Sequence, residues 1–225
     1  MDVITLREQL VAWWERSGRD FPWRKTRNPY HVLIAEVLLH RTRANQVLPL
    51  YERTLEAFPT VYDLAEANPE RVYRILHSAG LRWRVELLLQ AAKDIISRFS
   101  GEIPRSRTEL ESIPGVGHYI AAAIRCFAFG EKDAIVDSNV VRVYGRVFDI
   151  HVTDSLRRNR DFHQLAASLV DPERPRGYNL ALLDLAAAVC TPRVPKCEQC
   201  PIARHCSYGS RVLGISLPLH HEDAR

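Results

Sequence analysis

The sequence of 225 residues lacks the features that mark membrane, secreted or β-sheet proteins. No apolar run reaches the roughly 18 residues that a membrane-spanning helix needs. The N-terminus, MDVITLREQLVAWWERSGRD, carries charges where a signal peptide would be apolar. Sustained alternation of polar and apolar residues, the pattern of a half-buried strand, is also absent. We therefore expect a soluble, cytoplasmic, all-α protein with no membrane partner.

The chain is also poor in glycine and only weakly charged overall. It has ten glycines and a net charge of +4, whereas its hydrophobic content of 46% is enough to fill one large domain or two small ones. A small positive charge suits a polyanionic partner, but many enzymes that never bind nucleic acid share it. Charge alone therefore gives only a weak indication of DNA or RNA binding.

Cysteine is scarce except in the last fifth of the chain, where CTPRVPKCEQCPIARHC has the spacing C-x6-C-x2-C-x5-C. Disulfides are rare in a reducing cytosol, so four clustered thiols indicate a metal site or an iron–sulfur cluster. Zinc sites usually pair their cysteines in two short knuckles, and only one short pair exists here. The spacing favours a [4Fe-4S] cluster over zinc and over unliganded thiols. The expected ligands are Cys190, Cys197, Cys200 and Cys206, whereas Cys126 is expected in the core.

Apolar residues recur at three- and four-residue intervals along most of the chain, which predicts helices separated by turns rich in proline and glycine. The tail after Cys206 loses this period and is expected to be a loosely held extension. The predicted helices span residues 3–16, 30–43, 45–57, 69–78, 83–98, 117–129, 138–148, 161–170 and 178–190.

Two of the ten glycines lie close together in TELESIPGVGHYIAAAIRCFAF, which predicts a short helix, a tight turn and a second helix. This is a helix-hairpin-helix pattern. Its glycines leave the amides at the start of the second helix open to a phosphate oxygen, with the helix dipole reinforcing the contact. Such contacts hold a DNA backbone without reading its sequence. A plain helix–helix turn is the alternative that a bare G-x-G pattern also allows.

Two acidic residues stand out from their surroundings. Asp137, in AIVDSNVVRVYGRV, precedes a predicted helix and is expected to cap it, a position that keeps a carboxylate ionised near a developing positive charge. Glu36 is the one charged residue between Val32 and Leu39. Burial would favour its protonated form, which makes Glu36 a candidate proton donor, although a glutamate at the rim of the core is an equal alternative.

Together, the segments LESIPGVGHYIAAAI, AIVDSNVVRV and CTPRVPKCEQCPIARHC resemble the hairpin, the catalytic aspartate segment and the cluster loop of the iron–sulfur branch of the endonuclease III superfamily of DNA glycosylases. The resemblance covers residues from about 17 to 206 in the right order. It implies two helical domains with a DNA-binding groove between them, into which one nucleotide would be flipped. The expected domains are a six-helix barrel at 25–136 with the hairpin at 107–129, and an N-/C-terminal domain at 1–24 and 137–225 with the cluster loop at 190–206.

The resemblance also implies different roles for two acidic residues in the reaction. Asp137 would stabilise the positive charge that develops on the sugar or activate the attacking water, and Glu36 would assist the departing base or hold that water. Bifunctional members carry a lysine where this chain has Tyr119. Tyrosine cannot form a Schiff base, so we expect a monofunctional glycosylase without strong AP lyase activity.

Further residues are expected to contact DNA. The resemblance makes Arg41 a candidate to enter the duplex in place of the flipped base, with Leu180 as a second wedge. The family pattern often has arginine where this chain has His40. Phosphate contacts are expected from the cluster-loop cations and from the hairpin, namely Arg193, Lys196, Gly115, Val116, Gly117 and His118.

The target base is predicted from two differences within the family. Adenine glycosylases generally have a Gln-Gln-Thr run after the glutamate and a further C-terminal domain, whereas this chain has His40-Arg41-Thr42 and ends 19 residues after Cys206. The stretch RDFPWRKTRNPYHVLIAEVLLHRT is similar to both the adenine and the G/T mismatch subgroups. We expect a monomeric, nucleoid-associated enzyme that removes thymine or uracil mispaired with guanine in double-stranded DNA. An adenine glycosylase is the alternative, and a catalytically silent iron–sulfur DNA-binding protein is a third.

Overall fold

A computed structural model describes residues 2–76 and 82–216, and no β-strand occurs in these ranges. The expected all-helical fold is therefore confirmed. The chain divides into two compact units, a central unit, Asp20–Glu131, and a terminal unit formed by Met1–Arg19 and Lys132–Arg225. The domain bounds expected from the sequence, 25–136 and the remainder, lie five residues from these at each end. No helix in the described ranges is both long and apolar enough to cross a membrane.

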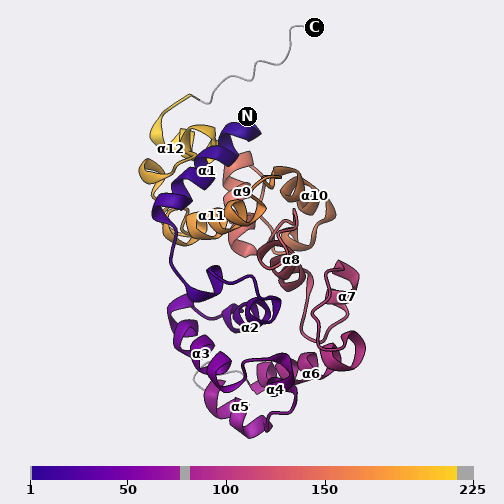
Figure 1. Cartoon of the computed structure of the whole chain (residues 1–225). Coiled ribbons are helices and arrows are strands. Elements are labelled where there is room, and N and C mark those ends of the chain that lie inside the picture. Colours follow the sequence, from indigo (N-terminus) through magenta and orange to yellow (C-terminus); the bar gives the residue numbers. More distant parts are fainter. Residues whose placement is uncertain (1, 77–81, 217–225) are drawn as a thin grey trace. The chain divides into compact units, whose positions relative to one another are not determined.

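The central unit is built around α2 (Pro29–Leu39), which is buried along its whole length from Val32 to Leu38. Asn28 caps this helix, and its Oδ1 accepts a hydrogen bond from the Tyr30 amide at 2.9 Å. Helix α2 packs against α3, α6 and α8, and Figure 1 shows it within this unit. The other elements are η1 (Pro22–Arg24), α3 (Ala44–Ala57), α4 (Val61–Ala65), α5 (Pro69–Leu76), α6 (Arg82–Phe99), α7 (Arg107–Glu111) and α8 (His118–Phe127).

The terminal unit joins the N-terminal helix to the C-terminal third of the chain. Helix α1 (Val3–Ser17) packs on α11 (Pro175–Ala188), and α11 packs on α9 (Ser138–Phe148). The apolar faces of these helices share one core. The remaining elements are η3 (Leu156–Arg158), α10 (Arg160–Leu169), η4 (Cys197–Gln199), η5 (Ala203–His205) and α12 (Ser207–Leu213).

Most predicted helices are present, but two expectations were wrong. The helix predicted over 30–43 ends at Leu39, because Arg41 has a positive φ of 61° that an α-helix does not allow. The expected loose extension after Cys206 instead begins with α12, whose Ser207 hydroxyl donates to the Val147 carbonyl at 3.0 Å. Residues 77 and 78 of the helix predicted over 69–78 lie outside the described ranges.

Asn179 holds the segment that leads to Asp137 against α11. Its side chain is 2% exposed, and its Nδ2 donates to the carbonyls of Asp133 and Pro175, each at 2.9 Å. Its Oδ1 accepts from the Ile135 amide at 3.1 Å. One side-chain amide thus satisfies three backbone groups in the core of the terminal unit.

We expect Asn179→Ala to lower the free energy of unfolding by about 3 kcal/mol, because it leaves buried backbone groups of Asp133 and Ile135 without their partner. Urea unfolding followed by circular dichroism measures this change. Asn45→Ala, at an exposed position of α3, is the matched control and is expected to be nearly neutral. An Asn179→Ala variant as stable as the control would contradict this role.

Candidate functional site

Asp137 is the N-cap of α9, as the sequence predicted. Its Oδ1 accepts hydrogen bonds from the amides of Asn139 and Val140 at 2.8 and 2.7 Å, and its Oδ2 accepts from the Asn139 side chain at 2.7 Å. The carboxylate is only half-buried. Three donors fix the orientation of the carboxylate at the N-terminus of the helix.

A half-buried arginine connects this aspartate to the cysteine loop, a link that the sequence did not reveal. Arg142, one turn further along α9, donates from Nη1 to the Asn139 side chain at 3.1 Å and from Nε to the Cys190 carbonyl at 3.0 Å. Its Nη2 donates to the Ala186 carbonyl at 2.9 Å. Burial lowers the pKa of Arg142, which the charges of Cys190 and Asp137 counteract. The position of Asp137 therefore depends on the loop that begins at Cys190.

Glu36 lies in α2 and is 5% exposed, so the sequence correctly identified an acid in an apolar setting. Its neighbours in the helix, Ala35 and Val37, are also buried. A carboxyl group at such a position costs free energy unless it has partners or a chemical task. Glu36 belongs to the central unit and Asp137 to the terminal unit.

The hairpin joins α7 to α8, and its two glycines serve different purposes. Gly115 has a φ of 79°, and a Cβ there would lie 3.2 Å from Leu87, so the fold itself requires glycine. Gly117, the N-cap of α8, has an ordinary extended backbone, and within residues 2–76 and 82–216 no atom beyond its chain neighbours lies within 4 Å of the place where its Cβ would be. No packing contact in the described ranges therefore requires glycine at position 117. Its missing side chain leaves the start of α8 open to a close approach from outside, which suits a phosphate.

The other hairpin residues divide between core and surface. Val116 is 3% exposed and its amide donates to the Ile113 carbonyl at 3.0 Å, so this residue supports the turn, and the DNA contact expected of it stays a prediction. His118 is exposed. Its Nδ1 lies 3.2 Å from Arg107 Nη1 and 2.9 Å from Glu111 Oε1. Tyr119 is half-buried in the first turn of α8. Arg107 adds a cation beside the hairpin that the sequence analysis did not single out.

The turn after α2 presents the candidate wedge residue. His40 and Arg41 are both exposed, and the His40 ring packs edge-on against Trp83 with centroids 6.0 Å apart. Arg41 is one of three non-glycine residues with a positive φ in the described ranges. A long, exposed cation at the tip of a turn has the shape that insertion into a duplex requires.

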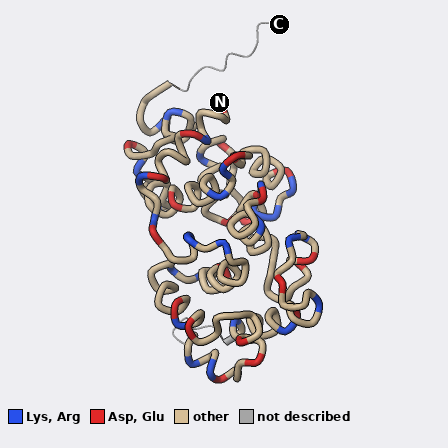
Figure 2. The backbone as a smooth tube through the Cα atoms, in the orientation of Figure 1, with Lys and Arg blue, Asp and Glu red and all other residues tan. Residues whose placement is uncertain are grey.

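The remaining predicted DNA contacts give a mixed result. Arg193 and Lys196 are exposed in the cysteine loop, whereas Leu180 is 3% exposed in α11. A buried leucine cannot enter a duplex without leaving its packing, so Leu180 does not fit the expected role of a second wedge. Figure 2 shows acidic and basic residues interspersed along the chain, so the basic character is not gathered into one run.

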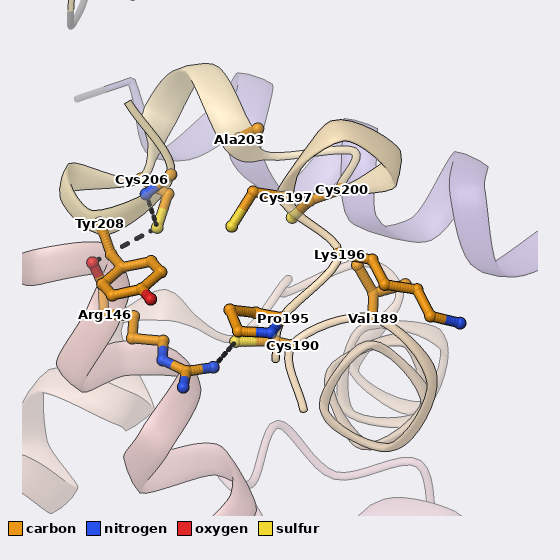
Figure 3. Close-up of a pocket in the computed structure, with 11 residues that line it drawn as sticks. Arg146, Val189, Cys190, Pro195, Lys196, Cys197, Cys200, Ala203, Cys206 and Tyr208 are labelled. Carbon is orange, nitrogen blue, oxygen red and sulfur yellow. Dashed lines mark hydrogen bonds between the residues drawn. The ribbon is translucent and has the colours of Figure 1, made fainter. Parts of the chain in front are cut away.

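The structure brings the four predicted cysteine ligands together. Cys190, Cys197, Cys200 and Cys206 line one pocket in the terminal unit, and their sulfur atoms face a common space (Figure 3). Arg146 donates from Nη1 to the Cys190 sulfur at 3.3 Å, and the Gly209 amide donates to the Cys206 sulfur at 3.3 Å. None of the five cysteines forms a disulfide.

The chemistry of this donor set, four thiols around one pocket, is that of the ligands of an iron–sulfur cluster. Within the described ranges, no group of three or more His, Cys, Asp or Glu side chains is placed to hold a single metal ion. A mononuclear zinc site would need four sulfurs about 2.3 Å from one point. A cluster separates its ligands further and bonds to four thiolates, and amide and guanidinium donors to the sulfurs, as at Gly209 and Arg146, are typical of such sites.

An open hairpin, a capped aspartate and a four-cysteine loop in an all-helical fold together define a class, the helical DNA glycosylases of base excision repair. The chain belongs to the HhH-GPD superfamily of base excision DNA repair proteins, whose family model matches residues 34–167.

Similar proteins support this assignment. A thymine/uracil-DNA glycosylase of Methanothermobacter thermautotrophicus is 38% identical over 200 residues, which cover 88% of this chain and 90% of the relative. An adenine DNA glycosylase of Rattus norvegicus is 36% identical over 94% of this chain, but over only 43% of its own length. The solved structure of a thermostable thymine-DNA glycosylase has a TM-score of 0.87 and 35% identity, covering 93% of this chain and 97% of that one.

We expect Gly117→Ala to change the free energy of unfolding by less than about 1 kcal/mol, because the new Cβ would meet no atom of the described residues within 4 Å. The same change should weaken binding to a fluorescently labelled duplex by about tenfold in anisotropy titrations, because a methyl group would obstruct a phosphate at the helix start. Gly115→Ala is the contrasting variant and should mainly lower stability, by about 1–2 kcal/mol. Unchanged DNA affinity in Gly117→Ala would contradict a phosphate contact there.

Proposed function

We propose that this DNA glycosylase is a monofunctional, monomeric enzyme that hydrolyses the N-glycosidic bond of thymine or uracil mispaired with guanine in duplex DNA. The observation that carries the proposal is the position of Asp137, a half-buried carboxylate held by three donors at the start of α9. A fixed anion of this kind suits a reaction that builds positive charge on a sugar.

Cleavage of the glycosidic bond gives the sugar oxocarbenium character and leaves negative charge on the base. Asp137 stabilises that positive charge or accepts a proton from the attacking water. Glu36 supplies a proton to the departing base or holds the water, a role that suits a carboxyl group in an apolar helix. Two acids in unlike surroundings can thus take different roles in one reaction.

Tyr119 is the basis for proposing a monofunctional enzyme. A lyase needs an amine that attacks the sugar and forms a Schiff base. Residue 119, in the first turn of α8, is a tyrosine, whose side chain is a phenol and not an amine. Water is then the nucleophile, and the product is an intact strand with an abasic site.

The choice of thymine or uracil is supported by the chain-wide similarity to thymine/uracil-DNA glycosylases. In the proposed complex, Arg41 enters the duplex beside the mispair. Backbone amides at the start of α8 hold a phosphate, and Arg193 and Lys196 contribute salt-sensitive contacts. Removal of adenine is the second candidate, because adenine DNA glycosylases are 36% identical to this chain.

A [4Fe-4S] cluster is the proposed cofactor, held by Cys190, Cys197, Cys200 and Cys206. These four thiolates would hold the cluster, which would crosslink the loop and supply no chemistry to the hydrolysis, because that reaction transfers no electron. Arg193 and Lys196 lie inside the loop that the cluster would fix. Arg142 donates to the Cys190 carbonyl and to the Asn139 side chain, which in turn donates to Asp137. A fixed loop would therefore help to fix the position of Asp137.

The purified protein should release thymine and uracil from G·T and G·U duplexes, seen as strand breaks only after alkali treatment. Asp137→Asn retains an oxygen for the N-cap and should fold normally, but its single-turnover rate should fall by a hundredfold or more, on the order expected for loss of one charge-stabilising group. Duplexes with A·G and A·8-oxoguanine test the adenine alternative. Cleavage confined to those duplexes would overturn the proposed base, and no cleavage on any duplex would overturn the enzyme activity.

Borohydride trapping with the same substrates should give no efficient covalent adduct. Tyr119→Lys places an amine at this position and serves as the control for the trapping chemistry. An adduct formed by the unmodified chain would contradict the monofunctional assignment.

Cys200→Ser should remove the brown colour, reduce the iron content and weaken DNA binding together, because the cluster holds the loop that carries Arg193 and Lys196. Cys126→Ala is the matched control, since Cys126 is buried in α8 apart from the four ligands and its replacement should leave the colour unchanged. Iron analysis, visible absorption and anisotropy titration measure the three properties. A colourless Cys200→Ser protein with full DNA affinity would show that the loop needs no cluster.

A further inference from the structure

The turn between α2 and α3 has a strained conformation. The Thr42 amide donates to the Leu39 carbonyl at 3.1 Å, His40 has φ −61° and ψ 109°, and Arg41 has φ +61°. These values describe a type II β-turn with Arg41 at the position that favours glycine or asparagine. A long side chain in this left-handed region is unfavourable, and such strain persists only where the surrounding structure enforces it.

A buried arginine on α6 supplies the enforcing contacts. Arg84 is 1% exposed, and its Nη1 donates to the Leu38 carbonyl and to the Thr42 hydroxyl, each at 3.0 Å. The first acceptor belongs to the last turn of α2, where carbonyls lack helical partners, and the second belongs to the β-turn. One guanidinium group therefore bonds to a residue that precedes Arg41 in the chain and to the residue that follows it.

The guanidinium of Arg84 is poorly satisfied for so buried a group. Its Nε and Nη2 are buried and make no hydrogen bond in the described part of the chain. An apolar residue of similar size would fill the same space without this desolvation cost. This cost indicates that the role of the cation lies in the two hydrogen bonds that its Nη1 donates, to the Leu38 carbonyl and to the Thr42 hydroxyl.

Trp83 adds a second support from the same helix. Its ring lies 5.6 Å from the Arg84 guanidinium and packs edge-on against His40, the residue before Arg41. The side chains of α6 therefore contact the turn on either side of Arg41. The positive charge of Arg84 also disfavours folding of the Arg41 guanidinium back onto the turn, because like charges repel.

We propose that Arg84 is a positioning residue that holds the turn in the strained conformation in which Arg41 is presented to DNA. The proposal rests on the proposed function, in which Arg41 enters the duplex beside the mispair. We call the two hydrogen bonds from Arg84 to Leu38 and Thr42 the clamp. Because the clamp fixes the turn before DNA binds, Arg41 loses less conformational freedom when it enters the duplex. The clamp therefore assists base flipping rather than general DNA affinity.

Hydrogen exchange tests the clamp without any substrate. In Arg84→Met, which keeps an apolar stem of similar length, amides in residues 38–43 should exchange about tenfold faster, because the Thr42-to-Leu39 bond opens more often. Thr42→Val removes only the hydroxyl acceptor and should give a smaller increase, so it covers the case in which Arg84→Met does not fold. Arg53→Met, an exposed arginine of α3 that bonds to its own helix, is the matched control. Unchanged exchange in all the folded variants would overturn the clamp.

A double-mutant cycle tests the purpose of the clamp. Arg84→Met should slow flipping, followed by 2-aminopurine fluorescence beside a G·T mispair, by about tenfold and leave affinity for matched DNA within about twofold. Arg84→Lys, which retains one donor, should restore part of the rate. In an Arg41→Ala background, Arg84→Met should have no further effect, and an equal loss in both backgrounds would overturn the positioning role. If the unmodified chain releases no base from any duplex, the proposed function fails, while the exchange result still decides the clamp.

Discussion

The terminal unit depends on the hydrogen bonds that Arg142 makes within it. From one position on α9, its guanidinium reaches the Asn139 side chain, the Ala186 carbonyl beyond the middle of α11 and the Cys190 carbonyl at the start of the cysteine loop. Asn139 in turn bonds to Asp137. A single half-buried cation therefore joins the segment of the candidate catalytic carboxylate, the core helix and the backbone of the first candidate cluster ligand, so none of the three can shift without straining the others.

This arrangement explains how one aspartate can serve both structure and chemistry. As an N-cap, Asp137 satisfies amides of the first turn of α9, which any cap residue would do. The additional bond from the Asn139 side chain fixes the second oxygen, which an isolated cap leaves free. A carboxylate whose two oxygens are both held does not reorganise when positive charge appears nearby, and this preorganisation is the source of electrostatic catalysis.

The sequence predicted those parts of the molecule that depend on neighbours within one or two turns. Apolar periodicity located the long helices, Asp137 was identifiable as a cap, and the hairpin and cysteine spacings were readable directly. The end of α2 was missed, because its stop signal is an arginine in a conformation normally taken by glycine. The burial of Val116 and Leu180 was missed as well, since burial depends on packing between distant elements. Arg84 and Arg142 were missed because the acceptors that give them their roles, apart from Asn139, lie more than 40 residues away.

Residues that serve the fold and residues that serve a partner can be distinguished by what surrounds them. Gly115 is required by its own backbone and by Leu87, whereas no atom in the described part of the chain requires a glycine at position 117. Arg142 has a protein acceptor for each of its three nitrogens, whereas two nitrogens of Arg84 have none among the residues that the structure describes. Where packing and backbone geometry would accept another residue equally well or better, the residue present indicates a requirement of function, such as binding to a partner. Gly117 and the turn held by Arg84 are two such positions, and both lie in the central unit, whereas Asp137 lies in the terminal unit.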